Sequence, residues 1–488
     1  MSYPIKFSWR IVGLWYLTFP VILFFFFWLR APYNIIFTII TIGVGLKYTI
    51  ELSKSLTKVR VNYRYLILTL CISLIFAILS GAGGFVWQKP DWTKHNVVLN
   101  DLINYRWPVN YGPSAYVKDT SLVYYVAYYL PAALIGKLFG WRAGELGLFI
   151  QTWLGIFIFA QLIGDSIRSS VMKYLLFFFM SGADIIGIFL FRDWSTIIHP
   201  QMLHLEYYAT SLQFSSVMTQ LMWVPQHAIS GWIGVMLAYK DYQDGKILRT
   251  LPLYVAITFL WSPFISLGLA LIFMPFVISK NIKLYFNLYT VAGLAITALT
   301  LLYYQSQLYV WRDKATTYFF HNEFILNNVG MMIAFLILDL YVFAIFFVYI
   351  RDRIDRNEIR FIAWLIILLI LIPQVMFGTA NDFDMRVSIP ALTLTFVFVL
   401  RYINELFKKK SIIKLLIIFL FVCGMCTPFA EIIQAYHKTE YATNERPTES
   451  MINAHLRYKV LHQQYMGLAT KAFGRYFGNY VLDSLHEK

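Results

Sequence analysis

The chain has 488 residues, of which 59% are hydrophobic and 14% charged, whereas an ordinary soluble domain has about 25% charged residues. This composition excludes a disordered chain, a nucleic-acid-binding module and an ordinary cytosolic enzyme. The net charge of +15 does not change that conclusion, because the basic residues of a membrane protein gather in its cytoplasmic loops.

Apolar runs of about 20 residues recur along the chain, and each is long enough to cross a bilayer core of about 30 Å. The runs are continuous and do not alternate with polar residues, which predicts helices and not a membrane β-barrel. We therefore expect an all-α polytopic membrane protein. The predicted spans are 11–29, 33–50, 65–87, 143–164, 172–191, 221–239, 284–304, 329–350, 361–378, 387–402 and 411–429.

Two further segments, 120–140 and 250–279, are ambiguous, and the distribution of positive charge decides both. With a cytoplasmic N-terminus, the basic runs 351–360 and 408–410 fall inside only if 120–140 does not cross the membrane. We expect 120–140 to be a half-buried juxtamembrane helix. The segment 250–279 has Pro263 near its middle, and we expect a hairpin of two short helices.

The predicted topology has about 13 membrane segments, given the length a helix needs to span a bilayer. The N-terminus is cytoplasmic, residues 1–429 form the transmembrane catalytic domain, and 430–488 form an extracytoplasmic tail. The outer loop 88–142 carries juxtamembrane helices. Because the long polar loops share the outer face, we expect the protein to act there.

The first outer loop carries the densest group of polar residues, including Asp91, His95 and Asp101. Pro90 can begin a helix, which places Asp91 and His95 four residues apart on one face. Asp101 would lie on roughly the opposite face. A carboxylate backed by a histidine can act as a general base or a metal ligand. The alternative is a solvated helix N-terminus, with Asp91 favoured by the helix dipole.

A second polar group surrounds the next outer loop and contains Asp193, His204, Glu206 and His227. His204 and Glu206 are two residues apart and resemble a ligand pair only in an extended segment. His227 lies just inside an apolar span, where burying an imidazole has a free-energy cost. The alternative is a hydrogen-bonded interfacial histidine without a role in chemistry.

A third group lies in the short loop between two late spans, where Asp382, Asp384 and Arg386 must sit at the membrane surface. Arg386 is the single basic residue of this loop, and its guanidinium suits a phosphate or carboxylate. Asp382 and Asp384 form a D-x-D that could hold a divalent cation such as Mg²⁺ or Mn²⁺. The alternative is an internal ion pair of Arg386 with one of the two aspartates.

At these residues the chain resembles the GT-C superfamily of integral-membrane glycosyltransferases, in an uncharacterised bacterial branch. The resemblance is architectural over about residues 10–430. It rests on the inside N-terminus and the acidic first outer loop. It also rests on three stretches, Ile135-Gly136-Lys137-Leu138-Phe139-Gly140, Trp223-Val224-Pro225-Gln226-His227-Ala228 and Asn381-Asp382-Phe383-Asp384-Met385-Arg386-Val387-Ser388-Ile389-Pro390.

The resemblance implies a sugar donor linked to polyprenyl phosphate and a lipid, glycan or protein acceptor, in the bacterial inner membrane. It implies that Asp91 is the catalytic base of an inverting transfer on the extracytoplasmic face. The residues that would bind substrate are His95, Asp101, His204, Glu206, His227, Asp382 and Arg386. Many members have two adjacent acidic residues in the first loop, whereas Trp92 follows Asp91 here, so metal dependence stays open.

Other functions remain open on sequence grounds. A lipid or polysaccharide transporter or flippase should carry ionisable residues near the midplane, where Asp184 and Lys47 are the candidates. An envelope polysaccharide polymerase or ligase should use arginine and histidine from a large late outer loop. A membrane O-acyltransferase needs a histidine deep in a span, and His227 comes nearest to that position.

Overall fold

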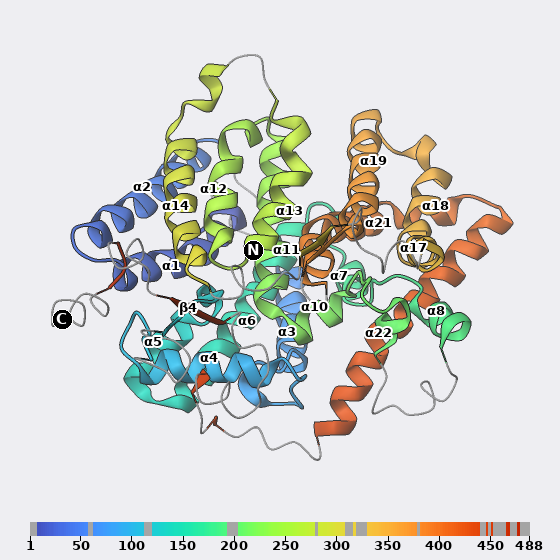
Figure 1. Cartoon of the computed structure of the whole chain (residues 1–488). Helices are drawn as coiled ribbons and strands as arrows, with labels where there is room; N and C mark the ends of the chain where they lie inside the picture. The colour runs from blue at the N-terminus through green and yellow to red at the C-terminus, as the bar shows by residue number, and fades with distance from the viewer. Residues whose placement is uncertain are drawn as a thin grey trace.

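The computed structural model is built almost entirely of helices (Figure 1). It describes residues 7–56, 62–111, 120–192, 204–278, 282–307, 316–318, 329–377, 381–439, 446–447, 450–451, 465–468 and 476–478. The helices of the first half are α1 (Trp9–Trp28), α2 (Tyr33–Lys54), α3 (Tyr63–Leu79), α4 (Trp92–Asn104), α5 (Leu130–Phe139), α6 (Trp141–Ile163), α7 (Val171–Phe177), α8 (Asp184–Phe191), α10 (Val217–Trp223) and α11 (Pro225–Gln243).

The second half continues with helices that carry the later apolar runs. They are α12 (Ile247–Phe259), α13 (Pro263–Phe273), α14 (Leu288–Gln305), α17 (Val329–Phe335), α18 (Tyr341–Tyr349), α19 (Arg356–Leu371), α20 (Asp382–Val387), α21 (Ile389–Lys408) and α22 (Ile412–Thr439). Two antiparallel strand pairs complete the described fold. They join β1 (Thr120–Leu122) to β4 (Met466–Leu468), and β2 (Thr316–Tyr318) to β3 (Val375–Phe377).

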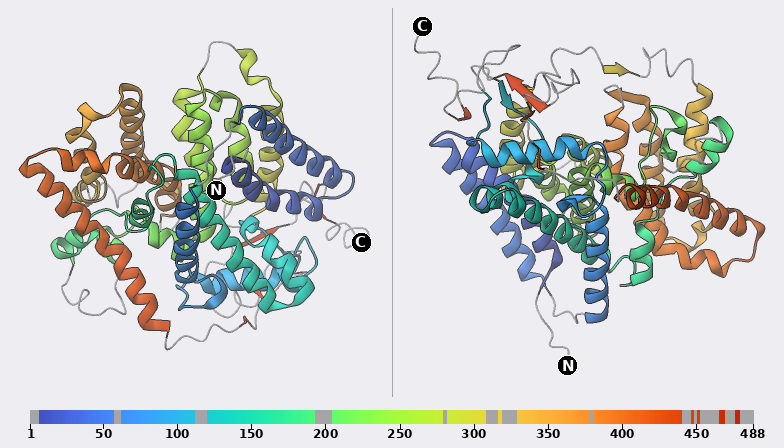
Figure 2. Two further views of the ribbon diagram at one scale, coloured as in Figure 1. Left: turned by 180° about the vertical axis from the view of Figure 1, so that it is seen from behind. Right: turned by 90° about the horizontal axis from the view of Figure 1, so that it is seen from below.

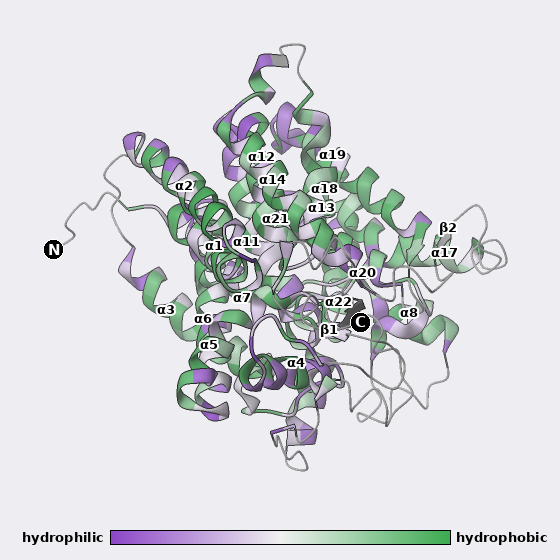
Figure 3. Cartoon of the chain, turned by 60° about the vertical axis from the view of Figure 1, so that its left-hand side comes forward, coloured by the Kyte–Doolittle hydropathy of each residue, from purple (hydrophilic) through white to green (hydrophobic). Residues whose placement is uncertain are grey.

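Eight helices in the described part of the chain are long and apolar enough to cross a membrane. Their outward faces carry large hydrophobic side chains that water would not tolerate in such numbers, for example Ile39 on α2 and Ile412, Leu415 and Phe419 on α22. Figure 3 shows the same contrast, since most long helices are coloured as hydrophobic while α4 is largely hydrophilic. The all-α, membrane-embedded class is therefore confirmed, whereas the count of about 13 segments stays a prediction of the hydropathy rule.

The two ambiguous segments both consist of short elements. The run 250–279 contains α12 and α13, which pack against each other and are separated at Ser262, whose hydroxyl caps α13. The predicted helix 120–140 is shorter than expected. Residues 120–122 form β1, 126–128 form a 3₁₀ turn, and the helix α5 occupies Leu130–Phe139, packed between α4 and α6.

Several predicted spans are not continuous α-helices. The α-helix in the predicted span 65–87 ends at Leu79, and the α-helix in 361–378 ends at Leu371, before β3. The segment 172–191 divides into α7 and α8, and 221–239 begins inside α10 and continues in α11 after a break at Val224. The segment 329–350 contains a π-helical stretch at Leu336–Leu340. A hydropathy average over a whole span did not reveal these breaks, although Asp184, Pro225 and Asp339 lie at or beside them.

The helix α22 is longer than the predicted span 411–429 and runs through Phe429 to Thr439. Figure 1 shows it as a long diagonal helix along one side of the molecule, next to α8, α10 and α18. Its last turns reach the segment between α3 and α4, where the Trp87 backbone amide donates to Thr439 Oγ1 at 2.9 Å. The helix therefore brings Glu431 and Gln434 to the elements that carry the candidate site.

Candidate functional site

The first element of the site is the N-terminal end of α4. Trp92 anchors this end, because its indole is buried and donates to the Met222 carbonyl at 2.9 Å. Gly81, at φ +88°, leaves room for that ring, since a Cβ there would lie 2.9 Å from Trp92 Nε1. Asp91 precedes the helix, and its side chain is 30% exposed with Lys94 Nζ 3.4 Å away. The anchored backbone therefore presents an accessible carboxylate.

His95 lies one helical turn beyond Asp91 and is held by two hydrogen bonds. Its Nε2 donates to the Trp223 carbonyl at 2.9 Å, because a carbonyl can only accept. Burial lowers the pKa of His95 to about 4, so the ring is neutral at pH 7. Its Nδ1 must then accept from the Tyr129 hydroxyl, 2.5 Å away. Both nitrogens are occupied, which makes His95 a positioning residue and not a proton acceptor.

The second element is α20, which follows a left-handed residue, Asn381, at φ +53°. Within this short helix Arg386 pairs with Asp382 at 2.9 Å and lies over the Phe264 ring, 5.9 Å from its centroid. The helical backbone points Asp384 elsewhere, and its carboxylate accepts from the Gln213 amide at 3.0 Å. The alternative arrangement, an internal ion pair of Arg386 with Asp382, is therefore the one present, and the D-x-D does not act as one unit.

Asp91 and Arg386 belong to one cluster, because both charges act on the same tyrosines. Burial raises the pKa of Tyr124, and the two charges oppose each other in shifting it further. Tyr129 experiences the same pair of charges, with a pKa that burial raises well above its usual range. Tyr125 lies nearer to Arg386, which partly offsets the rise of its pKa to about 12. We call these five residues, with His95, Asp382 and His227, the Asp91–Arg386 cluster.

His227 is the least satisfied member of this cluster. Its side chain is fully buried, its ring lies 5.1 Å from that of Tyr125, and neither ring nitrogen has a hydrogen-bond partner among the described residues. The amide of the preceding residue, Gln226, is likewise buried and unpartnered there. Each such group costs about 1–3 kcal/mol unless something satisfies it. These two side chains therefore have unused hydrogen-bonding capacity within the described residues.

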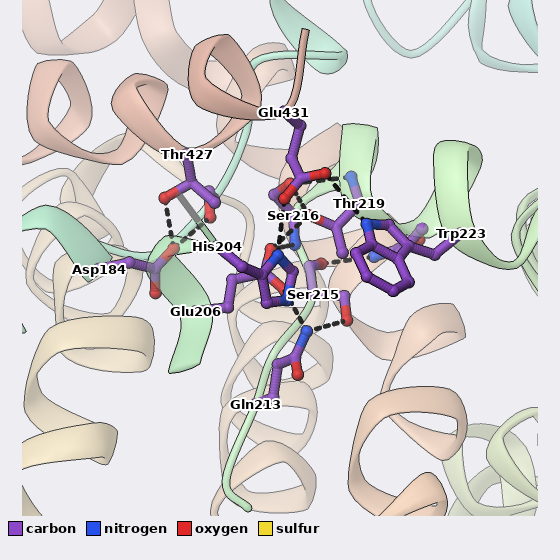
Figure 4. Close-up of polar contacts among 12 residues, drawn as sticks. Asp184, His204, Glu206, Gln213, Ser215, Ser216, Thr219, Trp223, Thr427 and Glu431 are labelled. Atoms are coloured by element: carbon purple, nitrogen blue, oxygen red, sulfur yellow. Dashed lines mark hydrogen bonds and ion pairs between the residues drawn. The ribbon is translucent and has the colours of Figure 1, made fainter. Parts of the chain in front are cut away.

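A second cluster, the Glu431 network, is connected to the first through Trp223. Figure 4 shows His204, Glu206, Thr219, Trp223 and Glu431 of this network. Glu431 accepts from His204 Nδ1 at 2.6 Å and pairs with Lys89 Nζ at 2.7 Å. Glu206 accepts from Thr219 at 2.6 Å and from the Ser216 amide at 2.8 Å, and His204 Nε2 lies 3.8 Å from its carboxylate. All four charged or imidazole side chains are at most 10% exposed, so the network is a buried, internally paired unit.

The titration behaviour of the network follows from its burial. Burial lowers the pKa of His204, but the Glu431 carboxylate outweighs that effect and the net pKa is raised. Burial also raises the pKa of Glu206 and lowers that of Lys89. The stable arrangement has Glu431 ionised between two cationic partners, with Glu206 held by neutral donors.

Trp223 joins the two clusters. Its carbonyl accepts from His95, and its indole Nε1 donates to Glu431 at 3.0 Å. The ring also lies beside His204, with centroids 5.2 Å apart. The break between α10 and α11 at Val224 allows this double role, because it frees the Trp223 carbonyl from the ladder of a continuous helix.

The predicted site residues thus divide into three places. Asp91, His95, His227, Asp382 and Arg386 share one cluster, and His204 and Glu206 belong to the adjacent network. Asp101 lies at a third place, where it accepts from the Tyr111 hydroxyl at 2.7 Å and the Met451 amide at 2.8 Å. Asp193 lies outside the described residues.

The residues do not form a cradle for a divalent cation. Among the described residues, no group of three or more His, Cys, Asp and Glu side chains is placed to hold a metal ion. Asp382 is committed to Arg386, and Asp384 is fully buried against Gln213. The donor set around Asp91 therefore does not fit a tightly held Mg²⁺ or Mn²⁺, which needs several oxygen ligands at once.

Sequence reasoning missed Lys89, Glu431 and Gln226. Glu431 lies two residues beyond the predicted last span, and an acidic residue that continues an apolar helix was the available signal. Lys89 and Gln226 gave no such signal, because their importance comes from burial against distant segments.

The chain matches no family model, no curated protein and no solved structure.

Proposed function

We propose that the chain is a membrane glycosyltransferase of the GT-C kind, which transfers a sugar from a polyprenyl-phosphate donor to an acceptor on the extracytoplasmic face. The observation that carries the proposal is the Asp91–Arg386 cluster. It combines an accessible carboxylate, a guanidinium held by Asp382, and the unpartnered buried imidazole of His227, and the unpartnered amide of Gln226 precedes His227 in the chain. A group transfer that removes a proton and releases a phosphate needs these two charges in one cluster.

The proposed step assigns each charge a task. Asp91 takes the proton from an acceptor hydroxyl while that oxygen forms a bond to the anomeric carbon of the donor. The bond from that carbon to the lipid phosphate breaks, the phosphate leaves with the electron pair on the opposite face, and the configuration inverts. Arg386 stabilises the negative charge on the leaving phosphate by charge-assisted hydrogen bonds.

The surrounding residues support this step without changing protonation. His95 fixes the position of Tyr129 and of the Trp223 backbone, and the unpartnered side chains of His227 and Gln226 offer hydrogen bonds to a bound sugar. The Glu431 network holds the loop that carries Asp91, because Lys89 precedes Asp91 by two residues.

The test is mass spectrometry of lipid extracts and envelope glycans from a strain that lacks the gene. The strain is complemented with the wild type, Asp91→Asn, Arg386→Gln or Arg386→Lys. We expect a polyprenyl-phosphate sugar to accumulate and one envelope sugar to disappear in the deletion strain, the Asp91→Asn strain and the Arg386→Gln strain. Losing a general base or a charge-stabilising donor commonly lowers turnover by about 100-fold or more.

A matched control is Asp165→Asn, which makes the same chemical change at a side chain that is 90% exposed and pairs with Lys240. This variant should restore the wild-type profile. Normal lipid and glycan profiles in folded Asp91→Asn and Arg386→Gln proteins would rule out the proposed function.

A second candidate, a proton-coupled transporter, is favoured by one specific observation. Asp184 and Asp339 are buried together, Asp184 at the start of α8 and Asp339 in the π-helical stretch. Asp184 accepts from Thr427 at 2.6 Å, and Asp339 accepts from Tyr208 at 2.5 Å. Buried acids in membrane helices commonly carry protons. Two results together would favour the transporter. Asp339→Asn would abolish substrate flux into liposomes, and Asp91→Asn would leave the lipid profile unchanged.

A further inference from the structure

A polar pocket of about 520 Å³ lies between the C-terminal half of α4 and the segment around residue 446, apart from the Asp91–Arg386 cluster. Its volume is within the range of about 300–1,000 Å³ that is usual for small-molecule sites. The side chains that line it and bear on the argument are Asn100, Asp101, Asn104, Tyr105, Arg446 and Ser450.

Hydrogen bonds between distant segments build the pocket. Arg446 donates to the amide oxygens of Asn100 and Asn104, at 3.1 and 3.0 Å. The Met451 amide donates to Asp101 Oδ2 at 2.8 Å, so the chain is attached to α4 on both sides of Ser450. These hydrogen bonds join the two sides of the pocket to each other.

Two buried polar atoms of the pocket residues have no partner among the described residues. They are Asp101 Oδ1 and Ser450 Oγ, on side chains of residues that are 0% and 9% exposed. The other oxygen of Asp101 accepts two hydrogen bonds, so this carboxylate is satisfied on one side alone. An unpaired buried acceptor of this kind is costly, and a ligand that donates a hydrogen bond would remove the cost.

We propose that this pocket binds a sugar unit of a glycan acceptor. A sugar hydroxyl can donate to Asp101 Oδ1, and a neighbouring hydroxyl can donate to or accept from Ser450. The ring of Tyr105, which is partly exposed and set edge-on to Tyr111 at 5.4 Å, offers an apolar face to the C–H groups of a sugar ring.

The place of the pocket on α4 indicates how such an acceptor would lie. Asn100 and Asn104 come 9 and 13 residues after Asp91. At the rise of an α-helix this separation is about 14–20 Å. The pocket would therefore hold a sugar well behind the reacting end of an extended chain. This inference rests on the proposed function and narrows the acceptor to an oligosaccharide or polysaccharide, bound remotely to favour the transfer.

The test is binding of the purified full-length protein, in detergent and fluorescently labelled, to a printed array of short oligosaccharides. We expect the wild type to bind a defined subset. Asp101→Asn should bind that subset at least about tenfold more weakly. The side-chain oxygen of the asparagine can still accept from Tyr111 and Met451, but its NH₂ group would replace the unpartnered oxygen that accepts from the sugar. Ser450→Leu should abolish binding by filling the pocket, and Ser450→Ala should weaken it.

Asp165→Asn is the control for the substitution at Asp101 and should bind like the wild type. Wild-type protein that binds no oligosaccharide, or folded Asp101→Asn and Ser450→Leu variants that bind like the wild type, would overturn the inference. The array result is independent of catalysis. Oligosaccharide binding together with a normal lipid profile in Asp91→Asn would uphold the pocket and reject the glycosyltransferase.

Discussion

His95 shows how the hydrogen bonds and the burial of one side chain determine its tautomer and its pKa. Both ring nitrogens are used, one by a carbonyl that can only accept and one by a hydroxyl. The lowered pKa of about 4 then fixes the tautomer. The same shift makes the stability of the protein depend on pH, because an unfolded chain would protonate this ring near pH 6.5.

We therefore predict that His95 destabilises the wild type as the solution is acidified. The contribution of neutral His95 is fully present above pH 6.5 and is lost between pH 6.5 and 4, amounting to about 3 kcal/mol. His95→Gln can keep both hydrogen bonds and does not titrate. Thermal unfolding in detergent from pH 7.5 to 4 should show a smaller loss for this variant, and equal losses would contradict the prediction.

The Lys89–Glu431 pair gives a second prediction at the residue scale. Both side chains are 1% exposed, so Lys89→Met leaves the buried Glu431 carboxylate with His204 as its remaining cationic partner among the described residues. Lys89→Met should lower the unfolding free energy by about 3–5 kcal/mol. Lys89→Met combined with Glu431→Gln should cost less than the two single changes together, since no carboxylate is then unpaired. Additive losses in thermal unfolding would argue against this ion pair.

At the scale of elements, α4 is positioned by close contact with α5 and α6. A Cβ on Gly136 of α5 would lie 2.5 Å from Ile103 Cδ1 of α4 and 3.3 Å from the Cα of Gly144 in α6. The absence of a side chain at Gly136 therefore lets three helices meet at one point. This meeting point lies at the end of α4 opposite Asp91, so it sets the angle at which the helix carries the carboxylate.

Gly136→Ala should accordingly destabilise the protein by about 1–3 kcal/mol and reduce sugar transfer. Gly43→Ala is a matched control in α2, where a Cβ would meet nothing within 4 Å. Its effect should be neutral or slightly stabilising. The double variant Gly136→Ala/Ile103→Ala should be more stable than the sum of the single changes predicts. A double-mutant cycle with no coupling would contradict this packing arrangement.

Sequence patterns predicted some of these elements and missed others for physical reasons. Pro263 marks the break between α12 and α13 because proline cannot continue the hydrogen-bond ladder of a helix. The break between α7 and α8 has no such marker. Its cause is tertiary, since Ala183 donates to the Leu338 carbonyl at 2.9 Å and Gly182 lies directly against Asp339. A pattern read along one segment cannot contain contacts made by a segment more than 150 residues away.

At the scale of the whole molecule, the arrangement of the candidate site was partly predictable. The three polar groups of the sequence do adjoin in the described structure, since Trp223 contacts both His95 and Glu431, and the charges of Asp91 and Arg386 act on the same tyrosine. The sequence could not assign Asp101 to a separate pocket or join Lys89 to Glu431. Those relations depend on how α22 and the segment around residue 446 return to α4 and to the residues just before it.

Membrane topology gives the final prediction. The test starts from a variant in which Cys71, Cys423 and Cys426 are replaced by serine. One cysteine is then introduced, by either Lys94→Cys or Arg353→Cys, because these side chains are 37% and 51% exposed. An impermeant maleimide should label the Lys94→Cys protein in intact cells and the Arg353→Cys protein after permeabilisation, following the positive-inside rule. The reverse pattern would place the Asp91–Arg386 cluster on the cytoplasmic face.

The pairing of β1 with β4 has a consequence for the order in which the protein is made. Thr120 pairs with Leu468 (Figure 2, right, shows β4 close to α4), and Val123 donates to the Tyr465 carbonyl at 2.9 Å. At about 5–20 residues per second, a ribosome would reach Leu468 about 20–70 s after Thr120. During that time β1 has been synthesised but its partner strand β4 has not. The segment that follows Asp91 and α4 is therefore translated early, but its contacts with β4 can form only near the end of translation.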